Sequence, residues 1–305
     1  MIRTLRGAAI GLAAALALTA CGGGGDSGDP LKGGGGGEGG QVVVGSANFP
    51  ENQLLGEIYA QALEAKGVKV QRKLNIGSRE VIYNQVKSGG LTVLPEYTGA
   101  LLAFIDPKTT AANPEEIVTE LKQKLPAELE LLNTSKAENK DSVTVTKKTA
   151  DANKIATIED LKPVAENMVI GAAPEFKERQ QGLKGLESVY GLDFKSFKEL
   201  DTDGPITWEN LNQDQVQVAN VYTTNPQIAK NGWVVLQDPK NLFSAQQVTP
   251  LVYKKGANET VRSTLNAISA RLTTQDLIKL MERVAIDKDD YDTVAGDWLK
   301  EKSLA

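Results

Sequence analysis

The chain has 305 residues, of which 24% are charged and 41% hydrophobic, and its formal net charge is -5. It contains no histidine and one cysteine, which excludes a Ser-His-Asp hydrolase, a histidine-ligated zinc site and a disulfide within the chain. The acidic balance argues against nucleic acid as a partner, although the many carboxylates leave open an enzyme that uses carboxylates alone.

The N-terminus has the pattern of an export signal. Two arginines precede a short apolar run over 7–18, and Leu-Thr-Ala leads directly into Cys21. Small residues before a cysteine are typical of a lipoprotein processing site. The apolar run is shorter than the roughly 20 residues that a transmembrane helix needs. We therefore predict a signal peptide at 1–20 and a lipid on Cys21, which anchors the mature protein outside the cytoplasmic membrane.

A glycine-rich stretch follows the signal. Residues 21–40 are mostly glycine with a few scattered polar residues. Such a composition cannot bury a core and behaves as flexible coil. We therefore predict a tether between the anchor and the folded part of the chain.

The next elements alternate between strand and helix. The patterns predict a strand at 42–44, a helix from Pro50 to Gly67, a strand at 68–74, a helix from Gly77 to Gly90, and a strand at 91–94 that Pro95 ends. This order predicts a parallel, doubly wound sheet. Because ligands bind beyond the carboxyl ends of strands in such sheets, the loops at 46–52, 76–79 and 95–99 should meet at one edge.

A second series of elements follows a polar stretch. It comprises predicted strands at 142–147, 168–172, 216–221 and 233–236, and a short helix at 157–161. By the same edge argument, Phe176, Arg179 and Tyr222 should face one cleft. A surface ion pair with Glu175 is an equally open interpretation of Arg179. A last strand at 248–254 returns to the first sheet, and the remainder from Gly256 is helical.

These elements predict a two-lobed α/β protein. Each lobe should be a doubly wound, mainly parallel sheet with flanking helices. We assign 41–141 and 250–305 to the first lobe and 142–249 to the second. The chain then crosses twice between the lobes, and the two crossings make a hinge.

One stretch of the chain resembles a known family. Gly77-Ser78-Arg79-Glu80-Val81 through Pro95-Glu96-Tyr97-Thr98-Gly99 is similar to the substrate-binding proteins of osmoprotectant ABC importers, which take glycine betaine, choline, carnitine or proline betaine. The similarity extends over essentially all of 42–304. It implies a periplasmic binding protein fold of the second type, with permease and ATPase partners. We therefore predict a monomeric binding protein for a small solute, without enzymatic activity, cofactor or metal.

The resemblance also implies a site. Family members often hold the quaternary ammonium head in a cage of four tyrosines, where cation–π attraction acts. Tyr97 and Tyr222 match two of them, while Asp141 and Gln246 stand at the other two positions, and Arg179 approximately matches a carboxylate-binding arginine. An aspartate in the cage favours a cation electrostatically. The predicted ligand-binding residues are Asn48, Phe49, Ser78, Arg79, Tyr97, Thr98, Asp141, Phe176, Arg179, Tyr222, Thr223, Thr224 and Gln246.

Three other functions stay open. Because the cage is incomplete, the chain could bind another small polar or cationic metabolite. A cell-surface hydrolase that uses only carboxylates, such as Glu96 and Asp141, is a second alternative, although nothing marks the two as a catalytic pair. An adhesin is a third, and regular lobes joined by hinge strands fit it poorly.

Overall fold

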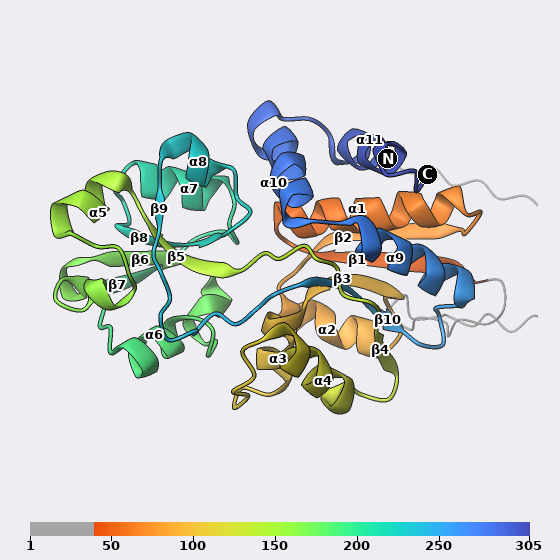
Figure 1. The fold of residues 1–305 in the computed structure, drawn as a ribbon, viewed down its shortest axis with the longest axis horizontal. Coiled ribbons are helices and arrows are strands. Elements are labelled where there is room, and N and C mark those ends of the chain that lie inside the picture. Colours follow the sequence, from red (N-terminus) through yellow and green to blue (C-terminus); the bar gives the residue numbers. More distant parts are fainter. Residues whose placement is uncertain (1–39) are drawn as a thin grey trace, which may run out of the picture. The chain divides into compact units, whose positions relative to one another are not determined.

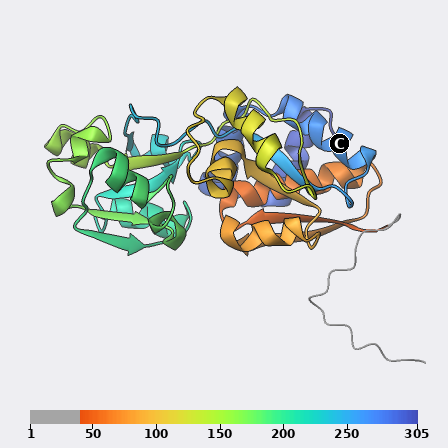
Figure 2. The same ribbon diagram turned by 90° about the horizontal axis from the view of Figure 1, so that it is seen from below.

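The computed structural model describes residues 40–305 of the chain. The predicted signal peptide at 1–20, Cys21 and the predicted tether up to residue 39 lie outside the described residues. Two five-stranded sheets with surrounding helices form the described part (Figures 1 and 2). We call the first sheet with its helices the first lobe, and the second sheet with its helices the second lobe.

The first lobe is built on a sheet with the strand order β2-β1-β3-β10-β4. Its strands are β1 (Val42–Ala47), β2 (Val70–Gly77), β3 (Val93–Tyr97), β4 (Leu129–Leu131) and β10 (Val248–Tyr253). Strand β1 pairs parallel with β2 and β3, whereas β10 pairs antiparallel with β3 and β4. Only β10 opposes the others, which confirms the predicted mainly parallel sheet.

Helices cover both faces of this sheet (Figure 1). On one face lie α1 (Pro50–Ala65), α9 (Glu259–Arg271), α10 (Thr274–Glu282), the π-helix Arg283–Asp287 and α11 (Tyr291–Glu301). On the other lie α2 (Arg79–Lys87), α3 (Thr98–Ile105) and α4 (Pro114–Lys124). Helix α1 starts with proline in its first turn, where the missing N–H costs nothing, and it buries Leu54, Leu55 and Ile58 completely.

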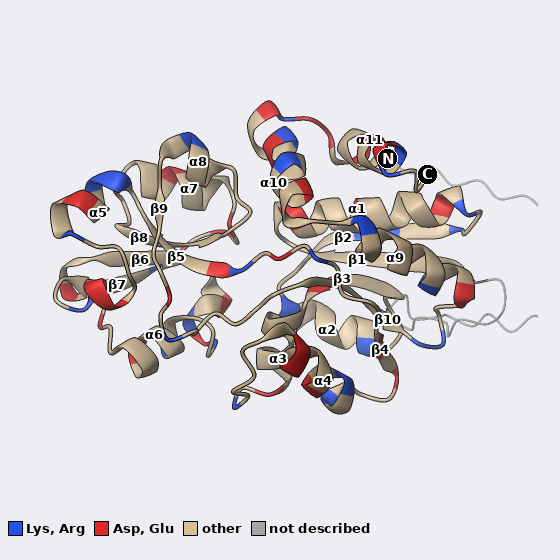
Figure 3. Ribbon diagram, in the orientation of Figure 1, with Lys and Arg blue, Asp and Glu red and all other residues tan. Residues whose placement is uncertain are grey.

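The second lobe repeats this topology with the order β7-β6-β8-β5-β9. Its strands are β5 (Asp141–Val145), β6 (Val169–Ala172), β7 (Ser196–Glu199), β8 (Val218–Tyr222) and β9 (Val234–Val235). Strand β6 is parallel to β7 and β8, and β5 is antiparallel to β8 and β9. Each sheet therefore has one reversed strand in the fourth place. Acidic and basic residues are interspersed along the helices of both lobes (Figure 3).

The second lobe also contains elements that the sequence patterns did not predict. Its helices are α5 (Lys147–Asn153), α6 (Leu183–Tyr190), α7 (Pro205–Asn212) and α8 (Gln227–Asn231), with 3-10 turns at Glu159–Leu161, Ala165–Asn167 and Pro174–Lys177. Among those missed are α5, α7 and β7. Helix α5 is short and polar, and its N-terminus depends on Thr146, whose side chain accepts from the Thr149 N–H. Strand β7 is a half-exposed edge strand without apolar alternation.

The prediction that Pro95 ends its strand is wrong. Strand β3 continues to Tyr97, with Pro95 directly opposite Pro250 of β10. Pairing between β1 and β3 has already ended at Val93, so no ladder bond needs the missing N–H of Pro95. The Asn52 side chain bridges the two strands instead, since its Nδ2 donates to the Pro95 carbonyl at 3.0 Å and its Oδ1 accepts from the Ala47 N–H at 2.7 Å.

Two crossing segments, 132–140 and 236–247, connect the lobes and lie side by side (Figure 1). The Asn139 N–H donates to the Gln246 carbonyl at 3.1 Å, and the Val248 N–H donates to the Ala137 carbonyl at 2.9 Å. Gly99 at the start of α3 leaves room for the second segment: a Cβ there would lie 2.4 Å from the Ala245 carbonyl oxygen. The lobe boundaries given above, at 141/142 and 249/250, stay predictions.

Candidate functional site

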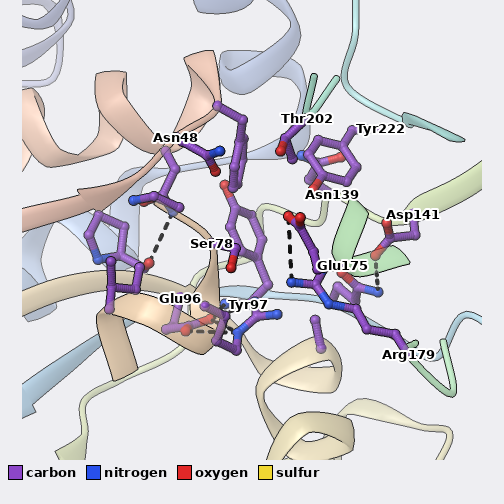
Figure 4. Close-up of a pocket in the computed structure, with 18 residues that line it drawn as sticks. Asn48, Ser78, Glu96, Tyr97, Asn139, Asp141, Glu175, Arg179, Thr202 and Tyr222 are labelled. Carbon is purple, nitrogen blue, oxygen red and sulfur yellow. Dashed lines mark hydrogen bonds and ion pairs between the residues drawn. The ribbon is translucent and has the colours of Figure 1, made fainter. Parts of the chain in front are cut away.

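A pocket lies between the lobes, at the ends of strands from both sheets. From the first lobe, Asn48, Arg79 and Tyr97 come from the regions that follow or end β1, β2 and β3. From the second, Tyr222 ends β8 and Asp141 begins β5 (Figure 4). The space measures about 520 Å³ when the solvent at its opening is included. We call it the inner chamber.

Three aromatic rings meet in the inner chamber. Phe49 lies edge-on to Tyr222 with ring centroids 5.0 Å apart, and it tilts against Tyr97 at 5.8 Å. Burial raises the pKa of both tyrosines well above the ordinary value, with a further contribution from Glu51 at Tyr97 and from Asp141 at Tyr222. Both side chains are therefore neutral phenols at physiological pH, and the three rings form an aromatic cluster with members from both lobes.

A buried carboxylate, Glu51, connects α1 to Tyr97, to the first crossing segment and to the region after β8. It lies in the first turn of α1 and is 3% exposed. Its Oε1 accepts from the Tyr97 hydroxyl and from Asn139 Nδ2, both at 2.8 Å, and its Oε2 accepts from the Thr224 hydroxyl. Burial raises the pKa of Glu51, and the three hydrogen bonds only partly offset that rise. The sequence patterns did not single out Glu51, although it lies in the loop 46–52 predicted to face the site.

Asp141 contributes a second carboxylate to the inner chamber. Asn220 Nδ2 donates to its Oδ1 at 3.1 Å, and Gln246 Nε2 approaches its Oδ2 at 3.4 Å. Both donors are neutral amides, so neither compensates the negative charge of the Asp141 carboxylate. Asp141 also lies opposite Tyr222 in the β5–β8 pairing, which places a negative charge beside an aromatic ring.

Two arginines line the pocket, and both are held by carboxylates of the protein. Arg79 contacts Glu96 through three hydrogen bonds of 2.8–3.1 Å. Burial would lower the pKa of Arg79, but Glu96 raises it above the ordinary value, so the guanidinium stays charged. Arg179 donates two 3.0 Å hydrogen bonds to Glu80 of the first lobe. The Arg179 guanidinium also lies 3.9 Å from the Glu175 carboxylate. Arg179 therefore lines the pocket and also forms the ion pair with Glu175 that the sequence left open. Its closer partner, Glu80, was not predicted.

Nine of the predicted site residues line the inner chamber: Asn48, Phe49, Ser78, Arg79, Tyr97, Asp141, Arg179, Tyr222 and Gln246. The other four lie elsewhere. Phe176 is in the core of the second lobe, and the Thr98 and Thr223 hydroxyls accept from N–H groups of the crossing segments. The Thr224 hydroxyl donates a hydrogen bond to Glu51. Ligand contact by these four residues, like ligand contact by the nine, stays a prediction. Lining residues that were not predicted include Asn52, Asn139, Glu175 and Thr202.

Within 40–305, no group of three or more acidic, histidine or cysteine side chains is arranged to hold a metal ion. Over the same range, none of the helices has the length and apolarity required to cross a bilayer.

The paired sheets and the pocket between them define a type II periplasmic binding protein. A solved structure described as a glycine betaine/carnitine/choline ABC transporter has this fold, with a TM-score of 0.68 and 20% identity over 87% of this chain and 99% of that one. Residues 40–301 match the family described as the substrate binding domain of ABC-type glycine betaine transport system. The chain belongs to this family.

Two relatives have similar sequences. The glycine betaine-binding protein YehZ of Escherichia coli is 29% identical over 276 residues, which cover 86% of this chain and 90% of the relative. The ergothioneine transport permease/ergothioneine binding protein EgtU of Helicobacter pylori is 25% identical over 269 residues. That alignment covers 86% of this chain but 48% of the longer relative. As a member of the family, the protein is an extracytoplasmic solute-binding protein whose partners are a small molecule and an ABC permease.

Proposed function

We propose that this protein delivers a quaternary ammonium compatible solute to an ABC importer. The observation that carries the proposal is the group of three aromatic rings, Phe49, Tyr97 and Tyr222, which comes from both lobes and has a carboxylate beside it. A trimethylammonium group has no hydrogen-bond donor, so aromatic faces and nearby negative charge must hold it. Each favourable cation–π contact contributes on the order of 0.5–2 kcal/mol.

The remaining pocket residues fit the other end of such a solute. Arg179 lies at the edge of the chamber and would donate hydrogen bonds to the carboxylate of a zwitterion in exchange for its contact with Glu80. Asp141 has only amide donors and attracts the cationic end. The relatives named for glycine betaine and ergothioneine support this class of solute.

The anchor and the mode of action belong to the same proposal. Lipid on Cys21 would hold the protein at the membrane, and it would act there as a monomer. It would bind its solute without converting it. The Glu96 carboxylate of the hydrolase alternative is occupied by Arg79 and by the Tyr97 N–H, which leaves it poorly placed for proton transfer.

A second candidate keeps the binding role but changes the solute. Asp141 and Gln246 occupy two of the four cage positions, so a small polar or cationic metabolite without three methyl groups could also satisfy the pocket. Asp141 would then accept a hydrogen bond from the ligand, and the Gln246 amide would form another.

Calorimetric titration distinguishes a quaternary ammonium solute from the second candidate. Glycine betaine, choline, carnitine and proline betaine should include at least one ligand of the purified protein. Tyr97→Ala and Tyr222→Ala should each weaken its binding by about 1–3 kcal/mol, through lost cation–π attraction and lost apolar contact. Tyr291→Ala, outside the pocket, is the matched control. If the wild type binds none of the four, the quaternary ammonium assignment fails and the second candidate replaces it.

A further inference from the structure

A second space adjoins the inner chamber, and we call it the outer chamber. It measures about 1150 Å³ including its opening, which exceeds the about 520 Å³ of the inner chamber. Both spaces are lined by the same five residues at their junction: Arg79, Ala100, Asp141, Glu175 and Arg179. The two chambers are therefore adjacent, with these five side chains between them, and a solute that occupies only the inner chamber leaves the larger space unused.

The floor of the outer chamber is apolar. It is formed by α3 and the residues after it, with Ala103, Phe104 and Pro107 facing the space. The Phe104 ring is half-buried and packs edge-on against Tyr83 with centroids 5.1 Å apart, so its orientation is fixed. This floor suits a flat or aliphatic surface of a ligand.

The opposite wall belongs to the second lobe and is polar. Gln180 and Gln181 contribute amides, and Lys184 contributes an ammonium that pairs with Glu178 at 2.7 Å. Gln181 is positioned by its own hydrogen bond to the Ser244 hydroxyl at 2.8 Å, in the second crossing segment. An occupant of the outer chamber would therefore meet an apolar surface on one side and hydrogen-bonding groups on the other.

The junction has a different chemistry. Arg79 and Arg179 both reach it, and their carboxylate partners, Glu96 and Glu80, hold them there. A ligand that runs from the aromatic rings to the outer chamber must pass these guanidinium groups. A carboxylate or another polar group next to the cation would meet them at this point.

We propose that the outer chamber binds the distal part of an extended quaternary ammonium solute, whose cationic head occupies the inner chamber. This rests on the proposed function and deepens it. The ligand class is a betaine or choline derivative that continues beyond its cationic head into a chain or ring that carries polar groups and an apolar face. Ala103, Phe104 and Gln180 then determine which solutes bind.

Competitive calorimetry with short and extended ligands tests this assignment. Glycine betaine is the short probe, and carnitine and ergothioneine are the extended probes. The wild type should bind at least one extended probe at least about tenfold more tightly than glycine betaine, a difference of about 1.4 kcal/mol. Ala103→Trp fills the outer chamber and should remove this advantage while changing glycine betaine affinity by less than about twofold.

Two further variants complete the design. Gln180→Trp obstructs the same space from an exposed position, so it reports on the chamber even if Ala103→Trp does not fold. Ile206→Trp, on the exposed surface of α7, is the control and should leave all affinities unchanged. Glycine betaine binding as tight as that of both extended probes overturns the inference and leaves the proposed function intact. The inference is also overturned if Ala103→Trp and Gln180→Trp bind the extended probes as tightly as the wild type does. Absence of binding to every probe, and to choline and proline betaine as well, overturns both.

Discussion

The hydroxyl of Tyr97 donates a 2.8 Å hydrogen bond to the buried carboxylate of Glu51, and this contact fixes the ring in the wall of the inner chamber. The same carboxylate accepts from the hydroxyl of Thr224, just after β8, so it joins the first lobe to the second. A single ionisable group therefore links ring orientation to the arrangement of the lobes, and its protonation should affect both.

The first prediction concerns the pH dependence that Glu51 confers. Burial raises its pKa above the ordinary value of 4.5, so the folded state holds the proton more tightly than the unfolded state does. The corresponding stability is present below the unfolded pKa and is lost as pH rises through the folded pKa. In urea unfolding between about pH 4 and about pH 8, the stability of the wild type relative to Glu51→Gln should fall with rising pH. Glu187→Gln, at an exposed position on α6, is the control, and a constant difference for Glu51→Gln would contradict the prediction.

The second prediction concerns the ion pair between the lobes. Burial would raise the pKa of Glu80, but the two hydrogen bonds from Arg179 outweigh it and lower the pKa to about 2. The contact is therefore fully formed above the ordinary carboxyl pKa of 4.5 and is lost as pH falls toward about 2. Small-angle scattering of the ligand-free protein should show a larger radius of gyration for Glu80→Gln at neutral pH, and for the wild type on acidification. Equal radii for Glu80→Gln and the Glu187→Gln control would show that the pair does not hold the lobes together.

The third prediction concerns Gly99. A Cβ at this position would lie 2.4 Å from both the Ala245 carbonyl oxygen and the Ser244 hydroxyl oxygen. Gly99→Ala should therefore displace the second crossing segment and lower the free energy of unfolding by about 1–3 kcal/mol. Gly90→Ala is a suitable control, because the nearest atom to its added Cβ is 3.4 Å away. Equal melting temperatures for the two variants would mean that the segment accommodates the methyl group without cost.

The fourth prediction concerns the lipid anchor. Cys21→Ala removes the only thiol in the chain and so the only site for thioether lipidation. The variant should appear in the soluble extracytoplasmic fraction or accumulate unprocessed, whereas the wild type should partition with membranes. Immunoblots of fractionated cells measure this, and a variant that stays membrane-bound in normal amount would rule out the anchor.

Local patterns predicted the elements that hold the site. The apolar run at Val42, the proline at Pro50 and the spacing of Leu54 and Ile58 were enough to place β1 and α1, because each signal lies within the element that it forms. The return of a last strand, β10, to the first sheet was also predicted, whereas its antiparallel direction was not. The strand end predicted at Pro95 was wrong, since proline is normally excluded from a paired strand, whereas here no ladder bond needs its N–H and the distant Asn52 side chain bonds its carbonyl.

The contacts of the site were less predictable than its elements. Glu80 and Arg179 are 99 positions apart, and Glu51 and Thr224 are 173 positions apart. No periodicity or motif relates such residues, because their distance depends on how the two lobes are placed. The individual side chains at strand ends could therefore be named, whereas their partners could not.

The place of β10 between β3 and β4 determines the order in which the lobes can be completed during synthesis. All strands of the second lobe come from one continuous stretch, 141–235, so this lobe has its full sheet before residue 248 is made. The first sheet can be completed only after β10 has been made, because β3 and β4 do not pair directly and β10 is the strand between them. A chain truncated before β10 would keep a complete second lobe but expose the unpaired edges of β3 and β4, which are templates for aggregation. Early stop codons should therefore yield insoluble protein even when most of the chain has been translated.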